Sequence, residues 1–402
     1  MDPNTIITSQ QEFETLCKQM HESGSVAFDT EFVSEYTFYP ELCLLQFAFD
    51  GNAYAVDPYE VNNLDPWWDL MLDEKIEKVI HGGREELRFC YDRTGQLPRN
   101  TFDVQLTQGL LSRGYPVSYS ALVERILGHK LSSKETRTDW RKRPLTKSQL
   151  RYALDDVVHL HNVIHKQREI LASRNRSHWE ELENKRYQTD LFSDLQEPGW
   201  KRLPQLSRLN RRELATAIEV SNWRDRTARE QNRPLRKLLR DDLVIDLAKR
   251  QPKTVSELEQ TRGFGAFSNP DARTSILGCV KVVASRPDKK LPPRIRDRQG
   301  GGRQDEHVLS KLLAIALAHL CAEQDVSPSL VATSSDLRDF VRWYNAGRKP
   351  QSAPKLASDW RAEICGDVLC DLLDGNVVLR VSDASREDPL KFEPYVSKTQ
   401  KR

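Results

Sequence analysis

Residues 26–32, VAFDTEF, read as a buried strand that carries two acids. Side chains two residues apart in a strand point to the same face, so Asp29 and Glu31 project together. Neighbouring carboxylates repel each other unless a cation lies between them, and hard ions such as Mg²⁺ or Mn²⁺ prefer oxygen ligands. A solvent-facing acidic pair on an edge strand would produce the same pattern. Further acids on the same face would favour a metal site.

The surrounding sequence predicts an α/β domain. Short apolar runs at 24–32, 42–50 and 53–58 predict a meander of three strands, with a hairpin turn at Asp50-Gly51-Asn52. Another strand is expected at 78–82. Helical periodicity follows at 64–74, 84–92, 103–113, 118–126 and 146–170. We expect this domain to cover residues 1–175.

The remainder of the chain has helical periodicity. Residues 205–286 predict a helical bundle, and 287–306, rich in Pro, Gly and charge, predict a linker. A last domain is expected at 307–392, with helices at 307–322 and 355–374. Gly375 is placed to end the second helix before a strand at 376–381.

Composition limits the class of protein. A chain of 402 residues with 30% charged residues predicts two or three globular domains. No apolar run reaches the roughly 18 residues of a membrane span, and the N-terminus lacks signal-peptide features. The seven cysteines have no C-x-x-C spacing, which predicts reduced thiols. These features predict a cytoplasmic protein without membrane contact.

The net charge of +2 hides an asymmetry. Residues 201–250 hold 14 Lys and Arg against 7 Asp and Glu, which makes this segment +7 and the remainder −5. A basic module attached to an acidic body is typical of proteins that bind a polyanion such as nucleic acid. A solvated helical face is the alternative reading.

More acids occur at the end of the first domain, in LTKSQLRYALDDVVHLHNV at 145–163. Its apolar residues recur at helical spacing, and Thr146 is a suitable N-cap. Tyr152 and Asp156 are four residues apart, so a phenol lies one turn from a carboxylate on the same stripe. A helical tyrosine that serves only packing would have the same spacing.

Taken together, residues 25–165 resemble ribonuclease D, a family of 3′-to-5′ exoribonucleases of the DEDDy superfamily. The resemblance rests on FDTEF at 28–32, DWRKRPL at 139–145 and YALDD at 152–156. It implies a ribonuclease H-like exonuclease fold followed by all-α HRDC and HRDC-like bundles. It also implies that Asp29, Glu31 and Asp156 hold two divalent ions, Mg²⁺ or Mn²⁺, and that Tyr152 orients the attacking water.

One residue departs from the family pattern. The second motif of the family places an Asp on the helix after a His-Gly segment, where HGGREELRF has Glu86. Glu85 and Asp92 lie on other faces of this helix, which leaves Glu86 as the fourth carboxylate. The extra methylene leaves an altered metal preference or an inactive domain open, since metal geometry tolerates little misplacement. Asp103 matches an acid found near this motif in the family, and we expect it to support the site without binding metal directly.

Basic residues precede the third motif, where an RNA backbone would enter. We expect RNA contacts from Lys134, Arg137, Arg141, Arg143 and Arg151, and stacking on a base by Trp140. The arginines and lysines could instead serve as caps or ion-pair partners. Trp140 could instead be a packing anchor.

The resemblance implies an enzyme that trims the 3′ ends of tRNA precursors and other structured RNAs. From the two-metal mechanism we expect it to release 5′-mononucleotides, and we expect a monomer. Two alternatives stay open at the level of sequence. HRDC modules also accompany DNA enzymes, so the chain could be a DNA 3′-to-5′ exonuclease. Glu86 also makes a non-catalytic RNA-binding protein conceivable.

Overall fold

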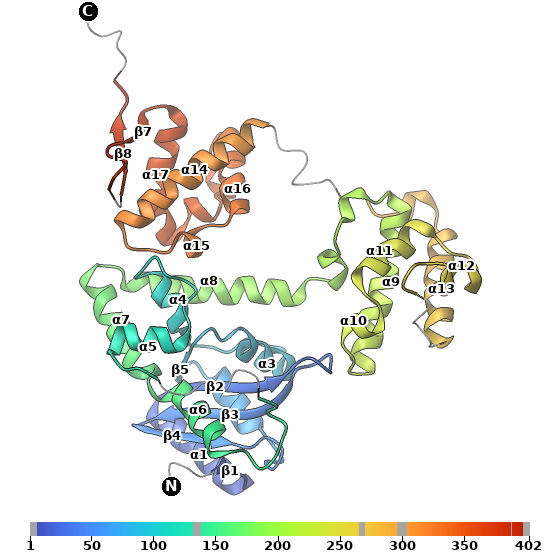
Figure 1. The fold of residues 1–402 in the computed structure, drawn as a ribbon, viewed down its shortest axis with the longest axis horizontal. Coiled ribbons are helices and arrows are strands. Elements are labelled where there is room, and N and C mark those ends of the chain that lie inside the picture. Colours follow the sequence, from blue (N-terminus) through green and yellow to red (C-terminus); the bar gives the residue numbers. More distant parts are fainter. Residues whose placement is uncertain (1–5, 132–137, 265–269, 296–303, 387, 397–402) are drawn as a thin grey trace, which may run out of the picture.

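The structure is a computed structural model that describes residues 6–131, 138–264, 270–295, 304–386 and 388–396. It has a mixed α/β domain, a long connecting helix and two helical domains (Figure 1). Within these ranges, no helix has the length and apolar character needed to span a lipid bilayer. All seven cysteines are free, as predicted.

The first domain contains a six-stranded sheet in the order β1-β4-β3-β2-β5-β6. Its strands are β1 (Ile6–Ile7), β2 (Ser25–Val33), β3 (Glu41–Phe49), β4 (Asn52–Val56), β5 (Glu77–Ile80) and β6 (Thr101–Asp103). The antiparallel meander β2-β3-β4 is confirmed. Its hairpin turn places Asp50 at φ 48° and Gly51 at φ 75°. β5 pairs with β2 and β6 in parallel.

Helices cover both faces of the sheet. Successive side chains of a strand point to opposite faces, so each face offers apolar residues against which helices pack. Phe28 packs with Trp67 and Leu87 beside α1 (Gln10–Ser23), α2 (Asp65–Leu72) and α3 (Arg84–Thr94). Ala27 packs on the opposite face with Val157, beside α5 (Tyr119–Leu127) and α6 (Lys147–Val158). The short α4 (Val104–Gly109) follows β6.

The helix expected at 146–170 is two helices, α6 and α7 (Leu160–Ser173), so a continuous helix was wrong. The chain breaks at His159, with φ −101° and ψ −6°. The break lets α6 cross β2, β3 and β4 while α7 packs on α4 and α5. Thr146 caps α6 as predicted, in a capping box with Gln149.

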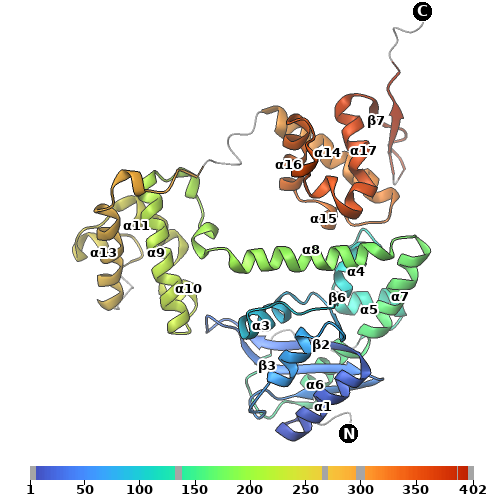
Figure 2. The same ribbon diagram turned by 180° about the vertical axis from the view of Figure 1, so that it is seen from behind.

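A 20-residue helix, α8 (Ser177–Gln196), connects the domains and was not predicted from the sequence. It lies between the first domain and the C-terminal domain in both views (Figures 1 and 2). Its buried side chains include Glu180, Glu183 and Asn184. Because these are polar, the helix lacks the apolar stripe by which an amphipathic helix is recognised in a sequence.

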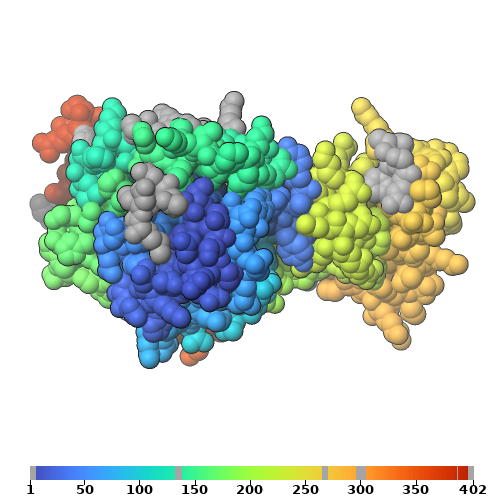
Figure 3. All heavy atoms as spheres, turned by 90° about the horizontal axis from the view of Figure 1, so that it is seen from below, coloured from blue at the N-terminus to red at the C-terminus, as the bar shows by residue number. Residues whose placement is uncertain are grey.

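The first helical bundle comprises α9 (Arg211–Glu230), α10 (Leu235–Leu238), α11 (Asp241–Arg250), α12 (Val255–Glu259) and α13 (Pro270–Ala284). Short 3-10 turns lie at Gly199–Arg202, Leu206–Arg208 and Asp288–Lys290. The bundle touches the loop after β2, since Oδ1 of Asn232 accepts hydrogen bonds from the N–H groups of Phe38 and Tyr39, both 3.1 Å. Figure 3 shows these two domains in contact.

The C-terminal domain comprises α14 (Gln304–Glu323), α15 (Pro328–Val331), α16 (Ser334–Asn345) and α17 (Asp359–Asp374), with 3-10 turns at Pro350–Ser352 and Lys355–Ala357. A hairpin of β7 (Val377–Val381) and β8 (Leu390–Pro394) follows. Gly375 ends α17 at φ 78°, as predicted. α16 and β8 were not predicted from the sequence.

Candidate active site

The sheet and α6 bring the predicted acids together. Asp29 and Glu31 lie on β2, and α6, which carries Asp156, packs across that strand. Burial raises the pKa of Asp29, and the charges of Glu86, Asp156 and Glu31 raise it further. Asp29 and Asp156, which are 127 positions apart in the chain, therefore lie in one site together with Glu31 and Glu86.

The other carboxyl groups are perturbed in the same direction. Burial, followed by the charges of Asp156 and Glu86, raises the pKa of Glu31 to about 8. Burial also raises the pKa of Asp156 to about 7. Ionising all four groups therefore costs free energy unless positive charge is supplied.

Glu86 lies in the first turn of α3 and is only 6% exposed. Its Oε1 accepts a 2.6 Å hydrogen bond from the hydroxyl of Thr30, and burial raises its pKa to about 7. Glu85 and Asp92 both lie 3.4 Å from the guanidinium of Arg88. Glu86 is thus the acid of this helix that faces the site.

The turn before α3 is held by Asp103 at the end of β6. Its carboxylate accepts hydrogen bonds from the N–H groups of Gly82 (2.9 Å) and Gly83 (3.2 Å). Gly82 has φ 66°, and a Cβ on Gly83 would lie 2.3 Å from Cδ1 of Ile80. The left-handed backbone at Gly82 and the crowding at Gly83 therefore favour glycine at both positions. This arrangement agrees with the supporting role expected for Asp103.

Tyr152 lies one turn before Asp156 and is half-buried. Burial, followed by the charges of Asp156 and Glu31, raises the pKa of its phenol above its usual value. The hydroxyl therefore keeps its proton at neutral pH, which suits a hydrogen-bond donor better than a general base.

The predicted RNA contacts fall into different environments. Lys134 and Arg137 lie outside the described residues, and Arg151 is exposed on α6. Arg141 lines a pocket of about 520 Å³, whose walls are residues 32–36 and residues of the segment 138–141. The first of these segments directly follows Glu31 in the sequence. The guanidinium of Arg141 forms two hydrogen bonds with Asp139, at 2.8 and 3.0 Å, and lies over the ring of Tyr36.

Two of the predicted RNA contacts require correction. Trp140 is 5% exposed and packs among Cys43, Leu44 and Ala153, so its ring is not open to a base. Arg143 forms an ion pair with the buried Asp57. Its remaining donors contact the backbone carbonyls of residues 43, 140 and 142. Both side chains therefore hold residues 138–146 on the sheet. Trp140 is the packing anchor and Arg143 the ion-pair partner that the sequence left open as alternatives.

Sequence reasoning missed two residues of this site, Thr30 and Gln46. Gln46 lies opposite Asp29 on β3 and is fully buried. Neither polar atom of its amide has a hydrogen-bond partner among the described residues. Gln46 could have been recognised in the sequence, because it is the single polar residue within the apolar strand LCLLQFAF.

Comparison with known proteins places this arrangement in a defined class. Residues 4–172 match the family model described as 3′-5′ exonuclease, and residues 213–267 match the HRDC domain. Both matches lie within the domains expected from sequence. The chain is therefore a 3′-5′ exonuclease with an appended HRDC domain.

The relatives define the family. Ribonuclease D of Bartonella henselae is 30% identical over 94% of this chain and 92% of its own length. Ribonuclease D of Gluconacetobacter diazotrophicus is 32% identical over 94% of this chain and 95% of its own. The chain belongs to the ribonuclease D family and is a 3′-5′ exoribonuclease, which confirms the resemblance.

A solved structure shares the whole architecture. The crystal structure of Escherichia coli RNase D, described as an exoribonuclease involved in structured RNA processing, matches with a TM-score of 0.79 and 24% identity. The match covers 92% of this chain and 98% of that one. The fold predicted from sequence is confirmed.

Proposed function

We propose that the chain uses two divalent ions, Mg²⁺ or Mn²⁺, to release 5′-mononucleotides from the 3′ end of RNA. The observation that carries this proposal is the convergence of Asp29, Glu31, Glu86 and Asp156. The strongest charges acting on Asp29 are those of the other three carboxylates. Bound cations would remove this repulsion.

The donor set fits such ions. Carboxylate oxygens suit hard divalent cations, and Mg²⁺ is usually held by one or two carboxylates together with waters and substrate phosphate. Among the described residues, no group of three or more His, Cys, Asp or Glu side chains is arranged to hold one ion. Pairs drawn from the four acids, completed by water and phosphate oxygens, would meet this requirement.

The residues of the site have separable tasks. Two bound ions would supply an activated water and stabilise charge on the leaving oxygen. Tyr152 would donate its hydroxyl proton in a hydrogen bond that orients the water. Thr30 holds Glu86 in place. The pocket lined by Tyr36 and Arg141 begins at Phe32, the residue after Glu31, and would receive the 3′-terminal nucleotide.

The substrate class proposed is the 3′ end of precursor tRNA and similar structured RNA. The relatives named ribonuclease D support an RNA substrate, and the +7 charge of residues 201–250 supports binding of a polyanion. A DNA substrate is the alternative. Residues that recognise a 2′-hydroxyl would distinguish the two.

The test uses a 5′-labelled tRNA with a short 3′ extension and a DNA oligomer of the extension sequence. With Mn²⁺ or Mg²⁺, RNA should shorten in single-nucleotide steps and yield 5′-mononucleotides, whereas DNA should stay intact. EDTA and Asp29→Asn should each stop the shortening. Arg380→Gln, at an exposed ion pair of the C-terminal domain, serves as the control. Equal digestion in EDTA would refute the metal proposal.

The monomeric state and the cytoplasmic location stay predictions. Light scattering after gel filtration should give the mass of one 46.4 kDa chain. A mass of two chains would refute the monomer.

A further inference from the structure

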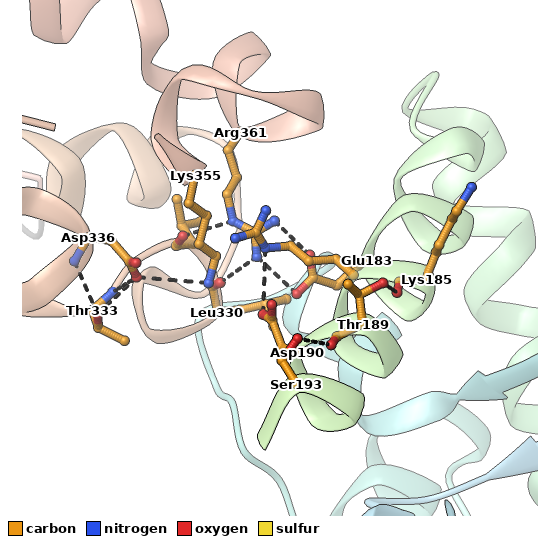
Figure 4. A network of polar contacts seen from close by, with 12 residues as sticks. Glu183, Lys185, Thr189, Asp190, Ser193, Leu330, Thr333, Asp336, Lys355 and Arg361 are labelled. Atoms are coloured by element: carbon orange, nitrogen blue, oxygen red, sulfur yellow. Dashed lines mark hydrogen bonds and ion pairs between the residues drawn. The ribbon is translucent and has the colours of Figure 1, made fainter. Parts of the chain in front are cut away.

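A buried ion pair fastens the C-terminal domain to α8. Arg361 of α17 is 1% exposed and contacts Glu183 of α8 through Nη1 at 2.7 Å and Nη2 at 2.9 Å. Nε1 of Trp360 donates to the same carboxylate at 3.0 Å. Arg361 also donates to the carbonyls of Val331 (2.8 Å) and Leu330 (2.9 Å). Figure 4 shows Arg361 and Glu183 facing each other from different domains.

The two domains also share an apolar core. Leu106, Leu110 and Trp179 of the nuclease side pack in one cluster with residues of α14 and α17. The rings of Trp179 and Trp360 stack at 5.1 Å. A Cβ on Gly109 would lie 2.8 Å from Leu330. The C-terminal domain is therefore part of the packing that fixes α8 against the nuclease.

The residue after Glu183 contacts the backbone of Asp103, the residue that holds the turn before Glu86. Oδ1 of Asn184 accepts a 2.9 Å hydrogen bond from the N–H of Asp103. Nδ2 of Asn184 donates to the carbonyl of Glu180 at 2.8 Å, which fixes the orientation of its amide. Asn184 and Asp103 are 6% and 3% exposed, so both are shielded from water that could replace these bonds.

Asp103 in turn fixes the turn in front of the fourth carboxylate. Its carboxylate binds the N–H groups of Gly82 and Gly83, and Glu86 follows in the first turn of α3. A shift of Asp103 would move this turn and with it Glu86. Displacements of about 1 Å at a reacting site are costly for catalysis.

We propose that Arg361, Glu183 and Asn184 are positioning residues for Glu86, so that the C-terminal domain belongs to the catalytic scaffold of the nuclease. The proposal rests on the role proposed for Glu86. Removing one partner of a buried ion pair is strongly destabilising, so the contact between Arg361 and Glu183 opposes displacement of α8. Packed side chains and rigid helices carry such a restraint across domains.

The experiment compares wild type, Arg361→Lys, Glu183→Gln and Asn184→Ser, with Arg380→Gln as the surface control in the same domain. Hydrogen exchange is measured on peptides covering residues 81–86 and 359–374. Calorimetry gives Mn²⁺ affinity, and steady-state kinetics give kcat and KM. The exchange measurement is independent of whether Glu86 binds metal.

We expect the three variants to exchange the amides of Gly82 and Gly83 at least tenfold faster, to bind Mn²⁺ about 10-fold more weakly, and to lose kcat with KM little changed. The control should match wild type. Protected Gly82 and Gly83 amides in all three variants would overturn the proposal. The proposal would also be overturned by a variant in which the amides of residues 359–374 exchange rapidly while those of Gly82 and Gly83 stay protected.

Faster exchange with unchanged Mn²⁺ affinity and kcat would instead refute the role of Glu86 while leaving the structural coupling in place. A rise in KM alone, with Gly82 and Gly83 still protected, would assign the C-terminal domain to RNA binding and overturn the proposal.

Discussion

The hydroxyl of Thr30 donates a 2.6 Å hydrogen bond to Oε1 of Glu86, which lies 56 residues later in the chain. Thr30 stands between Asp29 and Glu31 on β2, so the strand that supplies two acids also holds a third. Glu86 has one more methylene than the Asp of the family motif. The threonine fixes the longer side chain within the site.

Replacing Thr30 by Val should therefore impair the enzyme while preserving its shape. The bond to Thr30 lowers the pKa of Glu86, so its loss should raise that pKa further. A hydrogen bond to a charged group contributes about 1.5–3 kcal/mol, which corresponds to a loss of roughly 10- to 100-fold in activity. The acidic limb of the kcat profile should move to higher pH. Thr30→Ser keeps the hydroxyl and should resemble wild type; equal defects in both variants would contradict this account.

Tyr152→Phe should lower kcat and leave RNA affinity nearly unchanged. The raised pKa keeps the phenol protonated, and in the proposed role it donates a hydrogen bond to the attacking water, a contribution of about 100-fold. The measurement is single-turnover cleavage together with RNA binding in EDTA. Tyr344→Phe, which removes a hydroxyl bonded to Asp374 in the C-terminal domain, is the matched control. A Tyr152→Phe enzyme with full kcat would exclude this role.

Metal should stabilise the protein more at high pH than at low pH. In the metal-free protein the pKa of Glu31 is raised to about 8 and that of Asp156 to about 7. The same acids ionise near pH 4 in an unfolded chain, so the folded state retains protons that the unfolded state loses. These two acids therefore do not lower the stability below about pH 4, and without metal their contribution becomes progressively more destabilising as the pH rises toward about 8.

Because metal ions bind the ionised form of a carboxylate, Mn²⁺ bound at the proposed site should raise Tm more at pH 8 than at pH 6. Differential scanning fluorimetry with and without Mn²⁺ measures this difference. Glu31→Gln should reduce it. An equal shift at both pH values would argue against ion binding by these acids.

Arg143 and Arg151 should respond differently to substitution. Arg143→Met leaves the buried carboxylate of Asp57 without its partner and should lower the free energy of unfolding by about 3 kcal/mol. Arg151 is exposed on α6, so Arg151→Gln should weaken RNA binding without lowering Tm. Urea unfolding and RNA binding at two salt concentrations separate the effects. An Arg143→Met protein of normal stability would contradict the structural role assigned to Arg143.

Local patterns predicted the parts of this site that depend on local geometry. The alternation of residues 26–32 placed Asp29 and Glu31 on one face, and Thr146 marked the start of α6. Asp103 and Glu86 were selected through the family resemblance. The features that the sequence did not predict depend on contacts between distant segments. The ion pair of Arg143 with Asp57 spans 86 residues, and α8 buries polar groups against two domains, so neither leaves a local period in the sequence.

The most direct test of the site is anomalous diffraction from crystals grown with Mn²⁺ and a short RNA, compared with Asp29→Asn. The account predicts two Mn²⁺ peaks among Asp29, Glu31, Glu86 and Asp156 in the wild-type protein, with at least one lost in the variant. Strong Mn²⁺ peaks elsewhere and none among these four carboxylates would contradict it.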